Sequence, residues 1–262
     1  KKSQELARTA LQLRDANTKL TQLSVQKDAF LSQISHELRT PMSSIRAFSE
    51  ILRGVEVLSP QEQVRYASII QEETIRLTRL LDDLLDLSVL ENRQVSLNVS
   101  TGSLRDLLDH SVAMARVGRD AAVMQIRRNI ADERVWLCTD LDRLNQVFLN
   151  LIVNAHKYCD AAEPKLQIIV RQSAQQLTID FIDNGSGISN EDQNLIFEKF
   201  SRIGGHESGG AGLGLAISRE ILQRLQGDIT YLPGQNGAAF RIRLPESVVG
   251  GVARTDLSST DY

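Results

Sequence analysis

Residues 32–45 read SQISHELRTPMSSI and place a proline inside an otherwise helical pattern. Pro41 cannot donate the helical hydrogen bond to the carbonyl of Glu37, and its ring crowds that carbonyl, at a cost of roughly 3 kcal/mol. His36 lies five residues before the proline, and Glu37 follows it directly. The stretch therefore predicts a helix with a bend within two turns of a histidine.

The position of His36 predicts an exposed imidazole. It follows the apolar residue Ile34 by two positions, about 200° around a helix, and Thr40 lies one turn later on the same face. A neutral imidazole is a nucleophile near pH 7, and Glu37 can hold one ring nitrogen as N–H while the other attacks. An inert surface histidine is the alternative. An HExxH zinc site is excluded because residue 40 is threonine.

The residues before this stretch carry a coiled-coil pattern. Leu6, Leu13 and Leu20 repeat with Thr9, Ala16 and Leu23 between them, which is an a/d seam. The seam changes phase near Lys27 and resumes at spacing four, which loosens or rewinds a supercoil. We expect residues 1–27 to form a coiled-coil stalk. It is either a plain dimerisation stalk or one that transmits rotation or bending.

The residues after this stretch predict a helical hairpin. The first helix stops around Gly54, and Ser59-Pro60-Gln61-Glu62 is a capping box that begins a second helix. That helix carries more leucine than two antiparallel helices can bury. Two copies of the hairpin would make a four-helix bundle, so residues 28–92 predict a homodimer.

After Glu91 helical and strand-like patterns alternate. Helices are expected near 103–118, 140–158 and 213–226, and strands in LQIIVRQ, LTIDFID, DITYLP and AAFRIRLP. Residues 93–246 thus predict an α/β sandwich with a mixed sheet, and the small, polar residues 247–262 predict a flexible tail. The fold class is multi-domain, with α and α/β parts.

Composition limits the classes of partner. The net charge is −3, so we expect no binding of nucleic acid or anionic membrane by charge alone. No apolar run approaches the roughly 18 residues of a membrane-spanning helix. The chain begins at Lys1 inside a helical pattern, so we expect a fragment whose missing N-terminal part could hold a sensor or a membrane span. Cys138 and Cys159 match no metal spacing and are expected to be buried, reduced thiols, as in a cytosolic protein.

Two glycine-rich stretches and one helix predict a nucleotide site. DNGSGI (183–188) follows a strand, and GGAGLGLAI (209–217) opens a helix whose N-terminus offers free N–H groups to phosphate. In NQVFLNLIVNAHKY (145–158), the oxygen of Asn154 suits Mg²⁺ and the charge of Lys157 suits phosphate. Asp183 could accept a hydrogen bond from an adenine amino group. Ordinary turns are the alternative. Neither a P-loop nor a dinucleotide fold matches.

In this order, the stretches resemble the histidine protein kinases of two-component signalling. FLSQISHELRTPMSSI resembles their H box and NQVFLNLIVNAHKY their N box. DNGSGI resembles the G1 box, IFEKFSRI (196–203) the F box and GGAGLGLAI the G2 box. The resemblance implies a HisKA-type dimerisation and phosphotransfer hairpin, followed by an ATP-binding domain of the Bergerat type.

The resemblance also implies a role for each motif residue. His36 would be the phosphoacceptor, Glu37 its base or orienting partner, and Thr40 the residue that positions water in a phosphatase reaction. Asn154 would bind Mg²⁺. Near the phosphates the resemblance implies Asn150, Lys157, Lys199 and Arg202, and close to the nucleotide it implies Tyr158. Asp183 would recognise adenine, with Gly185 and Gly187 in its turn. The lid would contain Gly210, Gly212 and Gly214, and Phe197 and Phe200 would anchor it to the bundle.

The resemblance therefore predicts ATP-dependent autophosphorylation of His36 and phosphotransfer to an aspartate of a response-regulator receiver domain. It further predicts phosphatase activity toward that regulator, within the cytoplasmic part of a signal sensor. His110, His156 and His206 are expected to be ordinary surface or packing residues. Two alternatives stay open, another Bergerat-type ATPase and a coiled-coil scaffold that only binds nucleotide.

Overall fold

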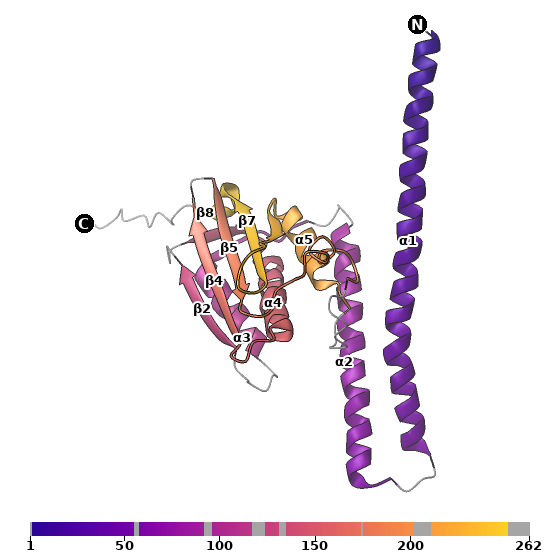
Figure 1. Ribbon diagram of the computed structural model, residues 1–262, viewed down its shortest axis with the longest axis vertical. Coiled ribbons are helices and arrows are strands. Elements are labelled where there is room, and N and C mark those ends of the chain that lie inside the picture. Colours follow the sequence, from indigo (N-terminus) through magenta and orange to yellow (C-terminus); the bar gives the residue numbers. More distant parts are fainter. Residues whose placement is uncertain are drawn as a thin grey trace, which may run out of the picture. The chain divides into compact units, whose positions relative to one another are not determined.

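The structure is a computed structural model that describes residues 2–54, 58–91, 96–116, 124–130, 135–173, 175–201 and 211–250. It divides into two compact units, with the division between Asp82 and Asp83 inside the second helix. The first unit is helical and the second is an α/β domain with a mixed sheet (Figure 1). The predicted fold class is confirmed. The predicted domain bounds stay predictions.

Two long helices make up the first unit, α1 (Lys2–Arg53) and α2 (Pro60–Glu91). Helix α1 has 52 residues and runs without interruption through Pro41, whose side chain is buried. The bend expected at this proline stays a prediction. Thr40 directly precedes Pro41, and its hydroxyl donates a hydrogen bond at 3.3 Å to the carbonyl oxygen of His36, one helical turn earlier.

The predicted capping box begins α2. The backbone N–H of Ser59 donates to Oε2 of Glu62 at 2.8 Å, and the N–H of Glu62 donates to the Ser59 hydroxyl at 3.3 Å. Two of the N–H groups that a helix start leaves without helical partners are thereby satisfied. Near the same end of the hairpin, the ring of Phe48 stacks on that of Tyr66, with 5.3 Å between centroids.

Exposed apolar side chains lie along one side of α1. Leu13, Leu20, Leu31 and Met42 lie within about 20° of one line along the helix, since each residue advances it by about 100°. Their exposed fractions are 73%, 65%, 48% and 58%. Exposed apolar side chains aligned on one side of a helix are typical of a surface that another helix covers.

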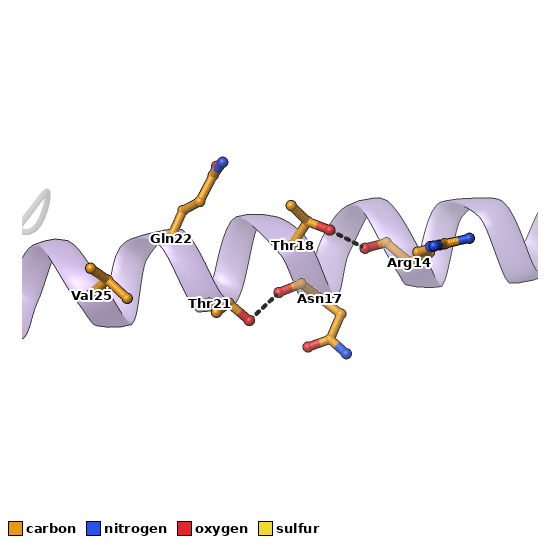
Figure 2. A pocket seen from close by; sticks show the side chains of 6 residues that line it. All are labelled: Arg14, Asn17, Thr18, Thr21, Gln22 and Val25. Atoms are coloured by element: carbon orange, nitrogen blue, oxygen red, sulfur yellow. Dashed lines mark hydrogen bonds between the residues drawn. The ribbon is translucent and has the colours of Figure 1, made fainter.

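A shallow hollow lies along the N-terminal half of α1, lined by Arg14, Asn17, Thr18, Thr21, Gln22 and Val25. Figure 2 shows that the hydroxyls of Thr18 and Thr21 donate to the carbonyl oxygens of Arg14 and Asn17, both at 2.9 Å. All the lining residues belong to one helix, so the hollow is a surface feature of the stalk. None of the described helices is long and apolar enough to cross a membrane.

Two sheets and three α-helices make up the second unit (Figure 1). The five-stranded sheet has the order β2-β4-β5-β7-β6, with β2 and β4 parallel and the other pairs antiparallel. A smaller sheet has the order β1-β3-β8. In chain order the elements are β1 (Ser100–Ser103), α3 (Leu104–Arg116), β2 (Gln125–Ile130), β3 (Trp136–Thr139), α4 (Leu141–Tyr158), β4 (Lys165–Gln172), β5 (Gln176–Asp183), α5 (Gly214–Arg224), β6 (Asp228–Tyr231), β7 (Ala239–Pro245), the 3₁₀ turn η1 (Glu246–Val248) and β8 (Val249–Gly250).

The core of this unit lies between the helices and one face of the five-stranded sheet. Alternate residues of the strands point toward the helices and are buried, as Ile168 on β4 and Ile179 on β5 are. The ring of Phe148 on α4 packs on that of Phe181 on β5, with 5.6 Å between centroids. This contact fixes α4 against the strand that ends at Asp183.

The structure adds strands β1, β2 and β3 to those predicted from the sequence, and it contradicts one prediction. Cys138 is exposed and Cys159 half-buried, so the expected burial of both thiols is wrong, although both are free of disulfides. Cys138 is exposed because it lies on the outward side of β3, where inward and outward positions alternate. In the smaller sheet, Gly250 of β8 pairs with Trp136 of β3. Residues 251–262 lie outside the described residues.

Candidate functional site

Helix α4 positions the first group of site residues. Its N-cap, Asp140, accepts a hydrogen bond from the backbone N–H of Arg143 at 3.1 Å. Its apolar stripe is buried, which leaves Asn150, Asn154 and Lys157 half-buried along one edge, at helical spacings of four and three. The sequence therefore folds so that one edge of α4 presents two amides and a cation.

Asn150 joins α4 to the beginning of α5. Its Nδ2 donates to the hydroxyl of Ser218 at 2.9 Å. A methyl group on Gly214 would overlap the side-chain oxygen of Asn150, so only glycine permits this approach. Two predicted site residues are thus in contact. Ser218 was not predicted, although its place one turn after Gly214 could have indicated it.

Gly212 closes the base of the lid segment. The backbone N–H of Phe200 donates to the carbonyl oxygen of Gly212 at 2.9 Å, so the two ends of residues 201–211 are held together. Gly212 has φ +69°, and a methyl group there would lie 2.6 Å from the carbonyl oxygen of Ser201. Both the positive φ and the close contact with Ser201 therefore require glycine at this position. Arg202, Gly210 and His206 lie outside the described residues.

Asp183 stands at the end of β5 and is 9% exposed. Its Oδ1 accepts hydrogen bonds from the N–H groups of Gly185 and Ala238, both at 2.9 Å. Burial raises the pKa of Asp183 above its ordinary value. The two N–H groups oppose that rise, and the charge of Asp160 adds to it. Both bonds use Oδ1, so Oδ2 can accept from a donor of a bound molecule.

The turn after Asp183 is held by residues that sequence reasoning missed. Asp160 accepts a hydrogen bond from the N–H of Ser186 at 2.7 Å, and the Tyr231 hydroxyl accepts one from the N–H of Ile188 at 3.3 Å. A methyl group on Gly237 would overlap the carbonyl oxygen of Asp183. The predicted Gly187 has φ +78° and faces Gly237. The one advance signal was the position of Asp160, two residues after the end of the N box.

The cationic and aromatic residues of the site are more exposed. Nζ of Lys157 lies 2.7 Å from the Tyr158 hydroxyl and 4.5 Å from the centroid of its ring. Tyr158 is 49% exposed, and the side chain of Lys199 is also exposed. Phe197 packs within the second unit, with its ring edge-on to Phe240 at 6.3 Å. Anchoring of the lid to the bundle by Phe197 and Phe200 stays a prediction.

The donor set suits magnesium only together with phosphate. No group of three or more His, Cys, Asp or Glu side chains that could hold a metal ion occurs among the residues described. Asn154 offers one neutral oxygen on the edge of α4. Mg²⁺ commonly keeps several waters and binds one or two protein oxygens plus substrate phosphates, so a lone amide oxygen fits it.

The histidine site lies in the first unit. The side chains of His36 and Thr40 are exposed, and that of Glu37 is half-buried. The predicted exposure of His36 is confirmed. An exposed imidazole beside a carboxylate can attack an electrophile brought to it, because no other side chain has to move away first.

Two family models match the chain, one for each of these sites. The model described as "His Kinase A (phospho-acceptor) domain" matches residues 26–93, which include His36. The model described as "Histidine kinase-, DNA gyrase B-, and HSP90-like ATPase" matches residues 139–248, which include Asn150, Asp183 and Gly214. The chain belongs to the sensor histidine kinases of two-component systems.

Curated sensor kinases are similar along most of the chain. The sensor protein kinase WalK of Staphylococcus aureus is 32% identical over 247 residues, which are 88% of this chain and 57% of that protein. WalK of Staphylococcus haemolyticus is 32% identical over 250 residues, which are 88% of this chain and 39% of that protein. This histidine kinase chain thus spans about half the length of the curated relatives it matches.

Solved histidine kinases share the fold. The Acinetobacter baumannii histidine kinase AdeS has a TM-score of 0.64 and 27% identity, over 80% of this chain and 97% of that one. The histidine kinase ThkA, solved in complex with the response regulator protein TrrA, has a TM-score of 0.68 and 21% identity, over 82% of this chain and 60% of that one.

Proposed function

We propose that this histidine kinase chain transfers the γ-phosphoryl group of ATP to His36 and then to an aspartate of a response-regulator receiver domain. The observation that carries the proposal is the exposed imidazole of His36 within the matched phosphoacceptor segment. The roles of His36 and of the nucleotide-site residues are inferred from their positions in the motifs and from the local geometry. Because ATP is the donor, the reaction belongs in the cytoplasm.

The proposed chemistry is an in-line displacement. One ring nitrogen of His36 attacks the γ-phosphorus with its lone pair, a P–N bond forms, and the bond to the oxygen of ADP breaks. Glu37 holds the N–H of the other ring nitrogen and stabilises the imidazolium that forms. The receiver aspartate then attacks the phosphorus, and the imidazole of His36 leaves in its neutral form.

The second unit binds and orients the nucleotide in this proposal. Oδ2 of Asp183 accepts from the adenine amino group, since the two backbone bonds of this carboxylate use Oδ1. The N-terminus of α5, held beside Asn150, and the cation of Lys157 face the phosphates. Mg²⁺ held by Asn154 would neutralise charge on the phosphate oxygens.

A homodimer accounts for the apolar stripes of the hairpin. Helix α1 exposes Leu13, Leu20, Leu31 and Met42, and α2 exposes Val64, Ile75 and Leu81. Two hairpins packed as a four-helix bundle would cover these side chains. Thr40 gives the same bundle a candidate phosphatase residue, because its exposed hydroxyl lies one turn from His36 and can orient a water molecule.

The proposal is tested with γ-labelled ATP and two histidine variants. We expect acid-labile protein labelling in the parent and none in His36→Gln. His110→Gln is the matched control, because His110 is also exposed but lies in the second unit, outside every motif, and it should label as the parent does. ATP hydrolysis without protein labelling would point instead to another ATPase of the Bergerat type. Nucleotide binding without turnover would point to a scaffold.

A further inference from the structure

The five-stranded sheet has a second face, opposite the helices. On β4 the side chains of Leu166, Ile168 and Val170 are buried toward the helices, whereas those of Gln167 and Arg171 are exposed on the other face. A groove of about 490 Å³ lies on this second face, and residues of β2, β4, β5 and β7 and of the adjoining loops line it. Figure 1 shows the sheet to which these strands belong.

Cations predominate in the lining of this groove. Four basic side chains line it, Arg127, Lys165, Arg171 and Arg241, against two carboxylates, those of Asp180 and Asp183. The excess of two positive charges (4 − 2) stands out in a chain whose net charge is −3. Lys165 forms an ion pair with Glu163 at 3.0 Å. The side chain of Arg171 is 55% exposed to solvent. The groove therefore has a positive field that faces solvent.

A buried carboxylate holds two of these cations in place. The side chain of Asp180 is 2% exposed and accepts three hydrogen bonds, two from Arg241 at 2.7 and 2.8 Å and one from Arg171 at 2.7 Å. These bonds use three of the ten N–H groups that two guanidinium groups carry. Asp180 thus orients both guanidinium groups and leaves most of their donors for another anion, with less side-chain freedom left to lose on binding.

The dimensions of the groove match an extended chain. Lys165 and Arg171 are both on β4, six residues apart, so the groove runs for about 20 Å along the strand. An extended segment of about six residues spans the same length, since each residue of an extended chain advances it by about 3.3 Å. A lone phosphate would meet only one end of this row of cations. Ile169 and Ile182 give the groove floor an apolar centre.

We propose that this groove docks an extended acidic segment of a partner protein, with carboxylates alternating with apolar residues. Alternate side chains of an extended segment point to opposite sides, so the carboxylates face the sheet and meet the guanidinium groups of Arg171, Arg241 and Arg127, while the apolar residues between them face away. The proposal is independent of phosphotransfer, because no residue of the groove except Asp183 belongs to the nucleotide site.

The experiment uses a fluorescein-labelled hexapeptide of alternating glutamate and valine, with a glutamine–valine peptide as its uncharged counterpart. By fluorescence anisotropy on the full chain, we expect the acidic peptide to bind at least tenfold more tightly, with an affinity that falls as salt rises. Arg171→Gln and Arg127→Gln should each weaken binding at least fivefold. Arg105→Gln, an exposed arginine on α3, is the matched control and should bind as the parent does.

Three results would overturn the proposal. Equal binding of the acidic peptide by the parent and Arg171→Gln, with Tm unchanged, would place the peptide elsewhere. Full competition by inorganic phosphate at equal concentration would identify a small-anion site. Binding only after deletion of residues 251–262 would show that the chain's own C-terminal segment occupies the groove. Autophosphorylation should be the same in Arg171→Gln and the parent, so failure here and failure of the kinase proposal are distinguishable.

Discussion

The helical hairpin and the α/β domain bury their apolar side chains in different ways. The α/β domain encloses its own core, in which Phe148, Ile168 and Phe181 are almost fully buried. The hairpin leaves leucine stripes in water, with Leu13 73% exposed. One unit is therefore complete as a single chain, whereas the other depends on a second copy.

The single tryptophan allows the two units to be followed separately. Trp136 lies on β3, in the α/β domain, so its fluorescence reports unfolding of that unit alone. Circular dichroism at 222 nm reports chiefly the long helices of the hairpin. A substitution that destabilises only the α/β domain should therefore change the tryptophan signal and leave most of the signal at 222 nm in place.

The largest effect is expected from Gly237→Ala. A methyl group there overlaps the carbonyl oxygen of Asp183, so the turn that holds the carboxylate must shift. We expect the α/β domain to lose about 3 kcal/mol or more, as for other backbone clashes, and nucleotide binding to be lost with it. Urea unfolding followed by Trp136 fluorescence measures this loss.

Gly234→Ala is the matched control for that substitution. Gly234 lies in the same loop with φ +78°, but a methyl group there meets nothing within 4 Å. It should cost only the roughly 1–2 kcal/mol of a left-handed residue. Equal losses in the two variants would show that the close approach of Gly237 to Asp183 is not what shapes the turn.

The next largest effect is expected from Asp183→Asn, on binding rather than stability. The amide can still accept the two backbone bonds through its oxygen, but its NH₂ group then faces the adenine amino group, donor against donor. We expect nucleotide affinity to fall about 30-fold to 160-fold, equivalent to roughly 2–3 kcal/mol for an unsatisfied polar contact. Isothermal titration calorimetry measures the affinity. An unchanged affinity would remove Asp183 from adenine recognition.

The pH dependence of Asp183 has opposite signs for binding and for folding. Burial raises its folded pKa above the ordinary value of 3.8. The ionised form therefore costs stability above the folded pKa, and this cost disappears as pH falls through it. Nucleotide binding uses the ionised form, so affinity should fall over the same pH range. Asp183→Asn should remove both dependences.

Much of this fold could be predicted because its main elements carry strong local patterns. The structure places β4, β5 and α4 within one residue of their predicted ranges, since alternating or helical burial marks them in the sequence. The short strands β2 and β3 were missed. Arg128 on β2 points inward and pairs with Asp109, and β3 exposes Cys138, so neither strand shows a clear apolar alternation.

The candidate site likewise contains residues that could be predicted from the sequence and residues that could not. Residues inside the motifs, such as Asp183 and Gly212, could be predicted because each motif is a local turn. Asp160, Tyr231 and Gly237 reach the same turn from positions 26, 43 and 54 residues away from their partners. Such contacts depend on how β6, β7 and the end of α4 pack together, and one sequence carries no local pattern for that packing.

A smaller effect, on the hairpin alone, is expected from Leu31→Lys. It places a charge in the apolar stripe of α1, which the proposed homodimer covers. Leu31 is 48% exposed in one chain, so leaving this position uncovered should cost about 1 kcal/mol per chain and about 2 kcal/mol per dimer, or roughly 30-fold in dimer affinity. Analytical ultracentrifugation measures the dissociation. Leu195→Lys is the control, because Leu195 is similarly exposed, at 52%, in the α/β domain. Equal dimer affinity in both variants would exclude α1 from the dimer contact.

The smallest effect is expected from Pro41→Ala, and it tests whether the hairpin carries the signal. The new N–H can donate to the carbonyl of Glu37, which favours a straight helix, but the buried proline ring is lost. We expect these changes to cancel within about 1 kcal/mol, so the dimer persists. The ratio of autophosphorylation to phosphatase rate should shift about threefold, because the helix beside His36 changes its preferred shape. If both rates stay at parental values, the stalk transmits its signal without a joint at Pro41.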